Sequence, residues 1–437
     1  MASGELVNLF ESKQGVVGII GLGYVGLPLA VEAAAVGFKV IGVDISQNAV
    51  DKVNKGISYI KDVSDEALAE EVKAGRLMAT TDFSRVKEMD AVIIAVPTPL
   101  DDHLNPDVSY IESACRAITP HLRPNQVISL ESTTYPGTTT EVMWPILKES
   151  GLVPEENIFL AYSPERVDPG NPTFQTKNTP KVVGGWGPES LAAASAFYGA
   201  VVDTIVPVSS LEAAEFTKLF ENTFRAVNIA LVNEMLLLCD RMKVDVWEVL
   251  HAANTKPFGI MKFMPGPGVG GHCIPLDPHY LEWKARAFNF RTRFIELAGE
   301  VNRSMPEFVR DKAARLLNEV AKPLKGSKVV VLGVAYKKDI DDWRESPAIE
   351  VLELLKESGA DVCYHDPFVA SFSEHGHSWT GVEMTDELIS GCDLVVITTS
   401  HSQKMDYQKV VDLAPMILDT REATRQCQDP EGKVTHL

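Results

Sequence analysis

Short apolar runs recur along the first two hundred residues and alternate with stretches of helical character. Residues 16–20, 91–96 and 126–130 hold no charged side chain. Runs of this length without polar alternation are typical of strands that helices bury on both faces of a parallel sheet. The pattern therefore predicts a doubly wound α/β domain.

The same alternation returns in the last third of the chain. A stretch rich in Lys, Pro and Gly at 322–326 precedes an apolar run at 328–333, and further runs follow at 394–397 and 416–418. Ser346 followed by a proline suits the N-cap and first position of a helix between these strands. A second α/β unit is expected here.

The middle of the chain has a helical pattern. Residues 212–243 contain no glycine or proline, which predicts one long helix. Lys218, Asn222 and Arg225 fall at i, i+4 and i+7 and share one face of it. This polar face is expected to belong to an active site only if it meets the Gly-Pro segment around Cys273 (residues 265–278), and is otherwise a solvated stripe.

A second helical stretch covers about residues 279–317, with an interruption expected at 305–306, where a proline lies. Helices of this length commonly join domains or form subunit contacts, which predicts a homodimer. The predicted fold is α/β, with two Rossmann-like doubly wound domains at 1–205 and 323–437. A central helical domain at 206–322, with a long connecting helix, joins them.

Length and charge narrow the range of functions. A chain of 437 residues is too long for one ordinary core, so several domains are expected. Its formal net charge is −19. Nucleic acid and anionic membrane both need a positive protein surface, so neither is predicted as a partner.

The cysteines and the N-terminal region favour a cytoplasmic protein. Six cysteines are scattered without paired spacing, which argues against a disulfide framework or a zinc ribbon. Residues 1–13 lack the features of a signal peptide. Residues 15–38 carry one charge and are long enough to span a bilayer, but their glycine spacing favours a strand, turn and helix.

A glycine motif follows the first apolar run directly. It consists of Gly21, Leu22, Gly23, Tyr24, Val25 and Gly26. In this setting the glycines let the backbone turn and approach a pyrophosphate at a helix N-terminus, and Asp44, at the end of the next strand, would accept a hydrogen bond from a ribose hydroxyl. No arginine occurs in the thirty residues after Asp44, which favours NAD over NADP; a capping role is the alternative for this aspartate.

Polar residues also follow two later strands. Pro97 and Thr98 come after the run at 91–96, and Ser132 and Thr133 come after the run at 126–130. Ligands of open α/β sheets bind beyond the carboxyl ends of strands. These residues are therefore candidate contacts to cofactor or substrate, with turn capping as the alternative.

Residues 265–278 hold four glycines and four prolines around a single cysteine, Cys273. No regular helix or strand can run through them. Glycine permits close approach of backbone amides to a ligand, and a thiol held there is a candidate nucleophile. A metal site formed by His272, Cys273 and His279 has no tetrahedral ligand set, so no metal is predicted.

Two further loops carry ionisable side chains. Glu165 lies in a loop after a predicted strand and could act as a base or orient a water; a surface salt bridge with Arg166 is the alternative. In the last third, Lys337, Arg344 and Arg421 stand where a phosphate or a sugar would need cations.

Together these motifs resemble the UDP-glucose/GDP-mannose dehydrogenase family over nearly the whole chain. The matching motifs lie at 21–26, 96–99, 132–133, 163–165, 218 with 222, 270–273 with 277, and 337–346. The resemblance implies oxidation of a nucleotide-sugar alcohol at C6 to a carboxylate, with two NAD⁺ used in turn. It further implies that Cys273 captures the aldehyde as a thiohemiacetal, which a second hydride transfer converts to a thioester for hydrolysis.

The resemblance also assigns roles to individual residues. The implied catalytic residues are Cys273, Lys218, Asn222, Asp277, Thr133 and Glu165. The implied cofactor-binding residues are the glycine motif, Asp44, Pro97, Thr98, Ser132, Thr133 and Arg344. The implied substrate-binding residues are Glu165, Arg166, Lys218, Asn222, Arg225, Pro267, Gly268, Gly270, Tyr336, Lys337 and Arg421.

Four positions depart from the family pattern. Pro169 replaces a second acid four residues beyond Glu165, and Ala49 replaces a basic residue after the ribose aspartate. Trp343 and Glu422 stand where smaller or amide side chains are expected. The first two departures put one acid and one adenosine contact in doubt.

The motifs at 167–171, 255–259 and 271–275 resemble the branch of the family that oxidises UDP-N-acetylhexosamines. The substrate that this resemblance favours is UDP-N-acetyl-D-glucosamine, and the manno epimer, the galacto epimer and UDP-glucose are the alternatives. Two other functional classes stay open: a two-electron dehydrogenase of the hydroxyacid type, which needs no thiol, and a non-catalytic NAD-binding protein. Counting NADH per substrate separates all three.

Overall fold

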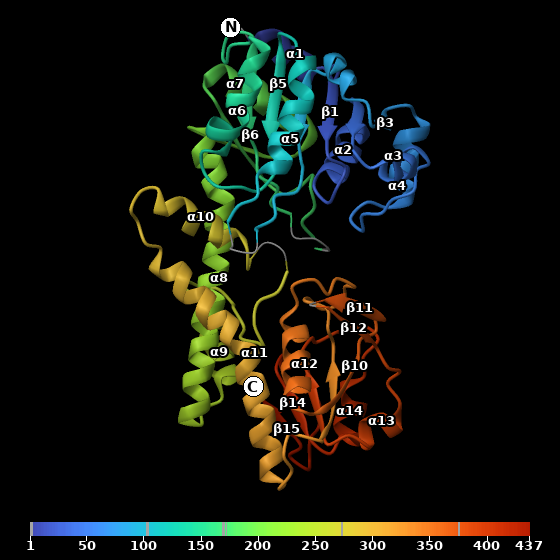
Figure 1. The fold of residues 1–437 in the computed structure, drawn as a ribbon, viewed down its shortest axis with the longest axis vertical. Helices are drawn as coiled ribbons and strands as arrows, with labels where there is room; N and C mark the ends of the chain where they lie inside the picture. Colours follow the sequence, from blue (N-terminus) through green and yellow to red (C-terminus); the bar gives the residue numbers. More distant parts are fainter. Residues whose placement is uncertain (1–2, 102–104, 168–170, 172, 272–273, 375) are drawn as a thin grey trace. The chain divides into compact units, whose positions relative to one another are not determined.

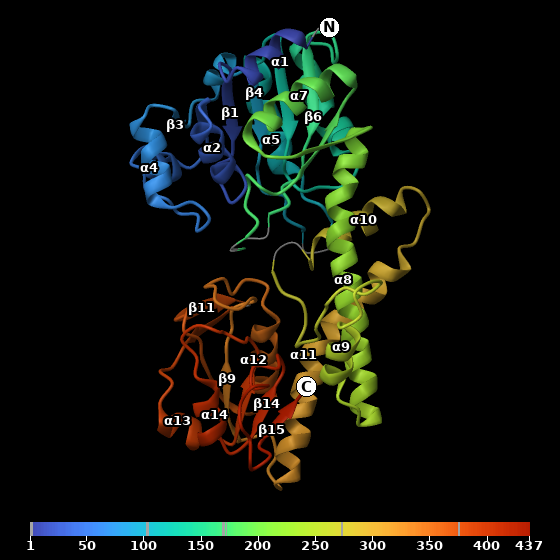
Figure 2. The same ribbon diagram turned by 180° about the vertical axis from the view of Figure 1, so that it is seen from behind.

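The computed structural model describes all residues except 1–2, 102–104, 168–170, 172, 272–273 and 375. It divides into two compact units. One consists of Met1–Glu221 and His279–Phe290, and the other of Asn222–Pro278 and Arg291–Leu437. Each unit is described by itself (Figures 1 and 2).

The first unit is built on an eight-stranded sheet with the order β3-β2-β1-β4-β5-β6-β7-β8. Its strands are β1 (Val16–Ile20), β2 (Lys39–Val43), β3 (Leu77–Thr80), β4 (Ala91–Ile94), β5 (Gln126–Leu130), β6 (Ile158–Tyr162), β7 (Lys181–Gly185) and β8 (Ile205–Val208). All neighbouring pairs are parallel except β6 and β7, which are antiparallel. The strands from β3 to β6 follow the doubly wound dinucleotide-binding order, and the strand order reverses between β1 and β4.

Helices cover both faces of this sheet. They are α1 (Gly4–Glu11), α2 (Gly26–Ala35), α3 (Gln47–Asn54), α4 (Asp65–Lys73), α5 (Ser109–Ile118), α6 (Trp144–Leu147) and α7 (Pro188–Val201). Successive strand residues point to opposite faces, so Ile19 joins the core under α2 and α7, whereas Ile20 joins the core under α5 and α6. This burial on both faces is why the strands read as uninterrupted apolar runs.

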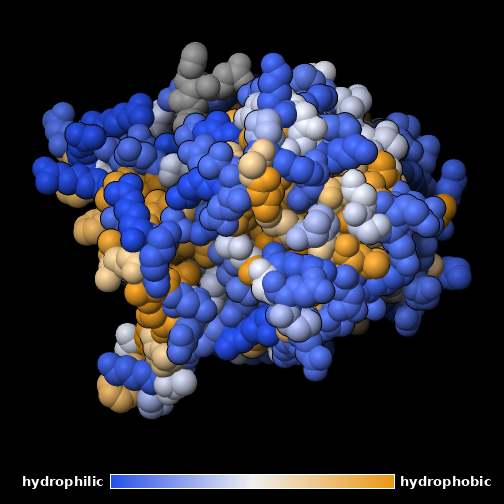
Figure 3. Space-filling model, turned by 90° about the horizontal axis from the view of Figure 1, so that it is seen from below, coloured by the Kyte–Doolittle hydropathy of each residue, from blue (hydrophilic) through white to orange (hydrophobic). Residues whose placement is uncertain are grey.

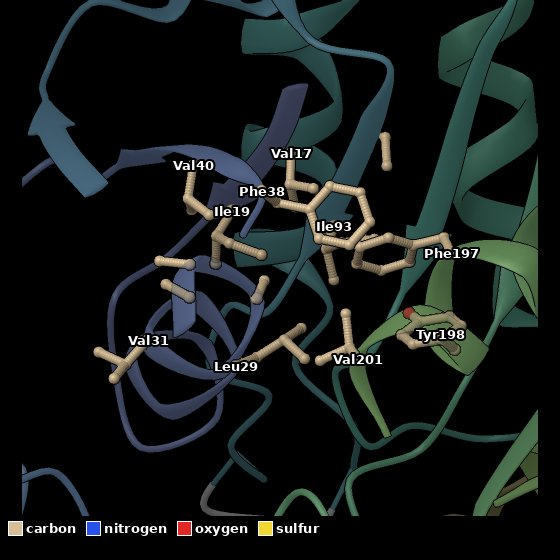
Figure 4. Packing of buried hydrophobic residues seen from close by; sticks show 14 of the residues in the cluster. Val17, Ile19, Leu29, Val31, Phe38, Val40, Ile93, Phe197, Tyr198 and Val201 are labelled. Atoms are coloured by element: carbon tan, nitrogen blue, oxygen red, sulfur yellow. The ribbon is translucent and has the colours of Figure 1, made fainter. Parts of the chain in front are cut away.

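Aromatic rings fill the first of these two cores. Phe38 and Phe197 lie side by side in Figure 4, with ring centroids 6.0 Å apart and edge-on geometry. Phe10 packs edge-on against both, at 6.5 and 5.7 Å. Each such pair stabilises the fold by about 0.5–1.5 kcal/mol beyond burial of its area. The cluster ties α1, at the start of the chain, to α7, near residue 200.

The second unit contains a five-stranded parallel sheet with the order β10-β9-β13-β14-β15. These strands are β9 (Lys328–Leu332), β10 (Asp361–His365), β13 (Leu394–Ile397), β14 (Ile417–Asp419) and β15 (Val434–His436), and a small antiparallel pair is formed by β11 (Ser371–Glu374) and β12 (His377–Thr380). One face packs against α11 (Arg293–Glu319) and α12 (Pro347–Glu357). The other packs against α13 (Asp386–Ser390) and α14 (Tyr407–Leu413). The prediction of two Rossmann-like α/β domains is confirmed.

The long helix of the middle region is α8 (Leu211–Met242), and the boundary between the two units falls within it. It is followed by α9 (Val246–Ala253), α10 (Asp277–Arg286) and α11. Among the described residues, none of the helices combines the length and the apolar character needed to cross a membrane.

The predicted interruption at residues 305–306 is wrong. Helix α11 runs through Pro306 without a break, and the helical stretch is broken earlier, between α10 and α11. Asn289 adopts φ 51° there, and the N–H of Phe290 donates to the carbonyl of Ala285. An asparagine in the left-handed region ends a helix, whereas an internal proline removes only one hydrogen bond and can be tolerated by a well-packed helix.

Candidate active site

A cavity of about 550 Å³ opens at the carboxyl ends of the first strands of the first unit. It is lined by the glycine motif, the end of β2 and the residues after β4, including Gly21, Gly23, Asp44, Ala95 and Pro97. This is where the strand order reverses between β1 and β4, the place where ligands of doubly wound sheets bind.

The glycines of this motif differ in what surrounds them. A Cβ added at Gly21 would lie 2.6 Å from the carbonyl oxygen of Ala95, and one added at Gly26 would lie 1.9 Å from the carbonyl oxygen of Gly21. A Cβ at Gly23 would meet nothing within 4 Å. The outer glycines are needed for close packing, and Gly23 leaves backbone accessible, as a bound pyrophosphate requires. These residues fit NAD.

Asp44 is tied to the glycine motif. Its carboxylate accepts hydrogen bonds from the N–H groups of Leu22 and Ser46, both at 2.8 Å. The hydroxyl of Tyr59 donates to the carbonyl of Leu22 at 2.8 Å. Burial, with the nearby Asp44 charge, raises the pKa of Tyr59 to about 12, so this tyrosine stays a donor. Nothing in the sequence singles out Tyr59, because it lies in a loop without a motif.

The polar residues after β4 and β5 connect the two strand ends. Ser132 Oγ donates to the carbonyl of Val96 at 2.7 Å, and Thr98 Oγ1 donates to the carbonyl of Thr133 at 2.5 Å. The hydroxyl of Tyr280 donates to the carbonyl of Thr98. The turn-forming role considered for Ser132 and Thr98 is therefore present, and it holds this edge of the sheet in shape.

Glu165 does not form the salt bridge with Arg166 that was the alternative to a functional role. Arg166 instead pairs with Glu221, with Nη2 and Oε1 2.6 Å apart. The Glu165 side chain is 14% exposed, and its carboxylate lies 3.6 Å from Nζ of Lys181. It also accepts the N–H groups of Arg166 and Val167, each at 2.7 Å.

The environment of Glu165 favours its ionised form. Burial alone would raise the pKa of this carboxyl, but the Lys181 charge, the two N–H donors and the Lys218 charge outweigh burial and lower the pKa. Lys218 is a predicted site residue on the first turns of α8. Lys181 could not be recognised from the sequence, because a lysine at the start of a short strand carries no motif.

One turn further along α8, Asn222 is almost fully buried in the second unit. Its side-chain N–H donates to Oδ2 of Asp277, and its carbonyl oxygen accepts from Nη2 of Arg225 at 2.9 Å. Asn222 and Asp277 are each 4% exposed. Asn222, on the polar face of α8, therefore contacts the Gly-Pro segment at Asp277, and this contact favours a functional role for that face. His272 and Cys273 lie outside the described residues.

The Gly-Pro segment packs against the C-terminal domain of the same unit. A Cβ at Gly266 would lie 2.4 Å from Nη1 of Arg421, and one at Gly270 would lie 2.7 Å from the carbonyl oxygen of Glu345 and 2.8 Å from Cβ of Tyr336. Gly268 adopts φ +132° against Pro347. Any side chain at these positions would collide, so the backbone itself lies next to Tyr336 and Arg421, two predicted substrate-binding residues.

The predicted cations lie at the carboxyl edge of the second sheet. Lys337 and Arg344 are in the loop after β9, and Arg421 follows β14. The Nε of Arg421 donates to the carbonyl of Thr398 at 3.1 Å, and burial, partly opposed by Asp419, lowers its pKa to about 10. Arg344 pairs with Asp342 at 2.8 Å. A sheet edge with these cations suits an anionic group such as a diphosphate.

Two departures from the family pattern have structural explanations. The indole of Trp343 packs on the ring of Phe372, with centroids 5.5 Å apart. The carboxylate of Glu422 lies 2.7 Å from Nε2 of His251 and 2.9 Å from Nη1 of Arg425. Both positions contribute to packing and ion pairing inside the second unit. Nothing in the structure explains Ala49 further, and Pro169 lies outside the described residues.

No group of three metal-binding side chains is assembled within the described part of the chain. The doubly wound sheet, the glycine turn and the aspartate at the end of β2 define an NAD-binding α/β protein. Comparison with known proteins refines this class. The chain belongs to the UDP-glucose/GDP-mannose dehydrogenase family: residues 16–202 match its NAD binding domain, 212–304 its central domain and 330–426 its UDP binding domain.

Similar proteins extend over almost the full length. The chain is 36% identical over 418 residues to the NDP-N-acetyl-D-galactosaminuronic acid dehydrogenase of Ralstonia nicotianae, covering 93% of this chain and 95% of the relative. It is 37% identical over 401 residues to the UDP-N-acetyl-D-mannosamine dehydrogenase of Escherichia coli K12, covering 89% and 94%. The solved UDP-D-ManNAc dehydrogenase of Pyrococcus horikoshii superposes with a TM-score of 0.86 and 31% identity, covering 96% of this chain and 98% of that one. The chain is thus an NAD-dependent nucleotide-sugar dehydrogenase.

Proposed function

We propose that this protein oxidises the C6 alcohol of a UDP-N-acetylhexosamine to the uronic acid in two successive NAD-dependent steps. The observation that carries the proposal is the contact between Asn222 and Asp277. It brings the polar face of α8 to the segment that contains Cys273, and a thiol is what a four-electron oxidation requires between its two hydride transfers.

The bound NAD supplies a hydride acceptor, and the chain's own residues carry the remaining chemistry. The Cys273 thiolate adds to the aldehyde carbon and keeps it in place, and after the second oxidation the acyl group remains on sulfur as a thioester. Lys218 and Asn222 stabilise the developing oxyanion. Asp277, Thr133 and Glu165 handle the hydrolytic water and its proton.

The second unit binds the nucleotide sugar in this proposal. Lys337 and Arg421 contact the diphosphate, and the backbone around Gly268 and Gly270 surrounds the sugar beside Tyr336. Arg166 and Arg225 complete the substrate contacts, and Arg344 reaches the cofactor. The proximity of the Gly-Pro segment to Arg421 and Tyr336 supports this assignment.

The identity of the sugar is a separate proposal. The resemblance of the sequence motifs implies UDP-N-acetyl-D-glucosamine, while the relatives described above are named for N-acetylmannosamine and N-acetylgalactosaminuronic acid. We propose an N-acetylhexosamine, with the epimer decided by a panel that contains the gluco, manno and galacto compounds and UDP-glucose. Production of NADH from UDP-glucose alone would contradict the acetamido assignment.

Stoichiometry tests the four-electron reaction. Two NADH formed per substrate consumed support the proposal, and one NADH supports a two-electron dehydrogenase. The Cys273→Ser variant should bind the UDP-sugar but release almost no carboxylate, because a serine ester or hemiacetal does not replace the thioester route. Full carboxylate production by this variant would remove Cys273 from the mechanism.

We further propose that the protein is a cytoplasmic homodimer. All five cysteines within the described residues are unpaired thiols, which supports a reducing compartment. Phe224, Leu231, Leu238 and Met242 of α8 are 38–62% exposed and recur at near-heptad spacing, as in helices that pack against one another. The view in Figure 3 is mostly hydrophilic, with hydrophobic residues concentrated toward its left side.

A further inference from the structure

A buried lysine lies between two buried carboxylates in the first unit. Nζ of Lys181 is 3.3 Å from Oε1 of Glu131 and 3.6 Å from Oε2 of Glu165. The Lys181 side chain is 5% exposed and that of Glu131 is 0% exposed. Both carboxyl oxygens of Glu131 are buried, and the Lys181 charge and the Tyr198 hydroxyl are the groups that favour its ionised form.

The direction of β7 explains how the lysine reaches this place. Strand β7 is antiparallel to β6, with Ala161 opposite Gly185 and Tyr162 opposite Gly184. Continued by three residues, this register sets Glu165 opposite Lys181. In a parallel strand, the first residue would lie at the far edge of the sheet, away from the carboxyl ends where ligands bind. The one reversed pair in this sheet therefore delivers a cation to the candidate active site.

An aromatic ring and a second lysine lie next to this cluster of Lys181, Glu131 and Glu165. The ring of Tyr198, from α7, lies 5.3 Å from Nζ of Lys181, and the Tyr198 hydroxyl donates to Oγ of Ser129 at 2.8 Å. Lys218, from α8, adds a second positive charge toward Glu165. The charge of Arg166 is balanced by Glu221, with which it forms an ion pair. Glu165 thus faces two cations, and Lys181 is the one that it shares with Glu131.

We propose that Lys181, supported by Glu131, is a positioning residue that holds Glu165 ionised and correctly oriented for hydrolysis of the thioester. This inference rests on the proposed function, which makes Glu165 a residue that handles the hydrolytic water. In that step Glu165 takes a proton from water, the water oxygen bonds to the thioester carbon, and the C–S bond breaks to return the Cys273 thiolate and a carboxylic acid, which then loses its proton.

The electrostatics agree with this role. Burial raises the pKa of Glu131 despite Lys181, and burial acting on Lys181 is outweighed by the two carboxylates, so the lysine stays charged. Without Lys181, two buried carboxyl groups would face each other and one would hold a proton. Loss of Lys181 also removes the largest interaction that lowers the pKa of Glu165, so a smaller share of Glu165 would be ionised at neutral pH.

Kinetics of a Lys181→Met variant test the proposal. The rapid formation of NADH before hydrolysis and the KM for the UDP-sugar should be kept, whereas kcat should fall about 10- to 100-fold. The acidic limb of the kcat profile should move up by at least about one pH unit. Lys181→Arg should restore most of kcat, because it returns the buried charge.

Two further variants separate positioning from folding. The double variant Lys181→Met/Glu131→Gln removes both members of the buried pair and should fold. It should still show slow hydrolysis and an acidic limb moved upward, by less than in Lys181→Met because the second carboxyl group is gone. Lys312→Met is a matched control, because Lys312 is 15% exposed and pairs with Asp240 in the second unit; its pH profile should be unchanged.

Two results would overturn the inference. One is that the unmodified chain is active and Lys181→Met has the same kcat and the same acidic limb of its pH profile. The other is an equal loss of thermal stability, NADH burst and KM in the single and double variants, which indicates a structural role alone. Silence of the unmodified chain with every UDP-sugar would instead overturn the proposed function, and this inference with it.

Discussion

The carboxylate of Asp44 is held in position by the protein itself, through the N–H groups of Leu22 and Ser46. Only its remaining lone pairs are left for a ribose. Asp44→Ala should raise the KM for NAD⁺ about 10- to 100-fold, because a hydrogen bond to a charged group contributes about 1.5–3 kcal/mol. Relative use of NADP⁺ should increase, since the charge that repels a 2′-phosphate is gone.

The matched control for this prediction is Asp51→Ala. Asp51 is exposed on α3 and accepts from the side chain of Gln47 at 2.7 Å. Its replacement should leave the KM for both cofactors unchanged. Equal effects of the two variants would mean that the net negative charge of the region, and not the contact with the ribose, governs the affinity.

Asp366 gives the C-terminal domain a stability that depends on pH. Its carboxylate accepts from Nε2 of the buried His401 at 3.0 Å and from the N–H groups of Val334 and Phe368 at 2.7 and 2.8 Å. Burial would raise the pKa of Asp366, but these donors and the histidine outweigh it and lower the pKa. The carboxyl is therefore a stronger acid when folded than when unfolded.

The sign of the effect follows from this shift. Stability from a lowered carboxyl pKa is fully present above the unfolded value, about 3.9, and is lost as the pH falls through the folded value. Asp366→Asn should lower the free energy of unfolding by about 2 kcal/mol at pH 7, and the difference from the unmodified chain should shrink below pH 4. Calorimetry from pH 7 to 3 measures this; a constant difference would contradict it.

At the scale of whole elements, the Gly-Pro segment acts through its backbone. Gly270 has no room for a side chain, because the carbonyl of Glu345 and Cβ of Tyr336 lie within 2.8 Å of where a Cβ would stand. Gly270→Ala should push the segment away from Tyr336 and raise the KM for the UDP-sugar at least tenfold, with the KM for NAD⁺ unaffected. Initial-rate kinetics with each substrate varied in turn would show the split.

Gly199 offers the comparison for that substitution. It lies on α7, and an added Cβ there meets only Ile205 at 3.6 Å, an ordinary contact. Gly199→Ala should keep both KM values and stabilise the protein by up to about 1 kcal/mol, as alanine does inside a helix. If both variants lose substrate affinity, a general effect on folding explains the loss better than the local clash.

The elements themselves were largely predictable from sequence. The strand runs, the glycine turn and the 32-residue helix α8 each carry a local signal: apolar continuity, glycine spacing or the absence of breakers. The predicted helix interruption at Pro306 was wrong, because a single proline in the sequence does not show how strongly its helix is packed. Lys181 went unnoticed because its meaning depends on β7 being reversed, and a strand of five residues gives no sign of its direction.

Contacts between distant residues were the least predictable part of the site. Asn222 and Asp277 lie 55 residues apart. Sequence spacing alone showed that Asn222 would have a functional role if its helix face met the segment around Cys273, but not that the two meet. The resemblance to the family named both residues but could not give their contact. The division into domains at 205 and 322 stays a prediction, which limited proteolysis can address.

For the whole molecule, the exposed hydrophobic seam of α8 leads to the last prediction. Leu231 and Leu238 lie one heptad apart and are 52% and 47% exposed. An isolated surface rarely leaves such a row of hydrophobic side chains in water, whereas a second copy of α8 could pack against it.

The unmodified protein should therefore have the mass of a dimer in light scattering. Leu231→Glu should weaken the dimer at least tenfold, because the new charge would be desolvated at the interface. Val153→Glu, at a residue 43% exposed in the first unit, should leave the dimer intact. A monomeric unmodified chain, or a Leu231→Glu variant that stays dimeric at nanomolar concentration, would show that α8 does not join two copies.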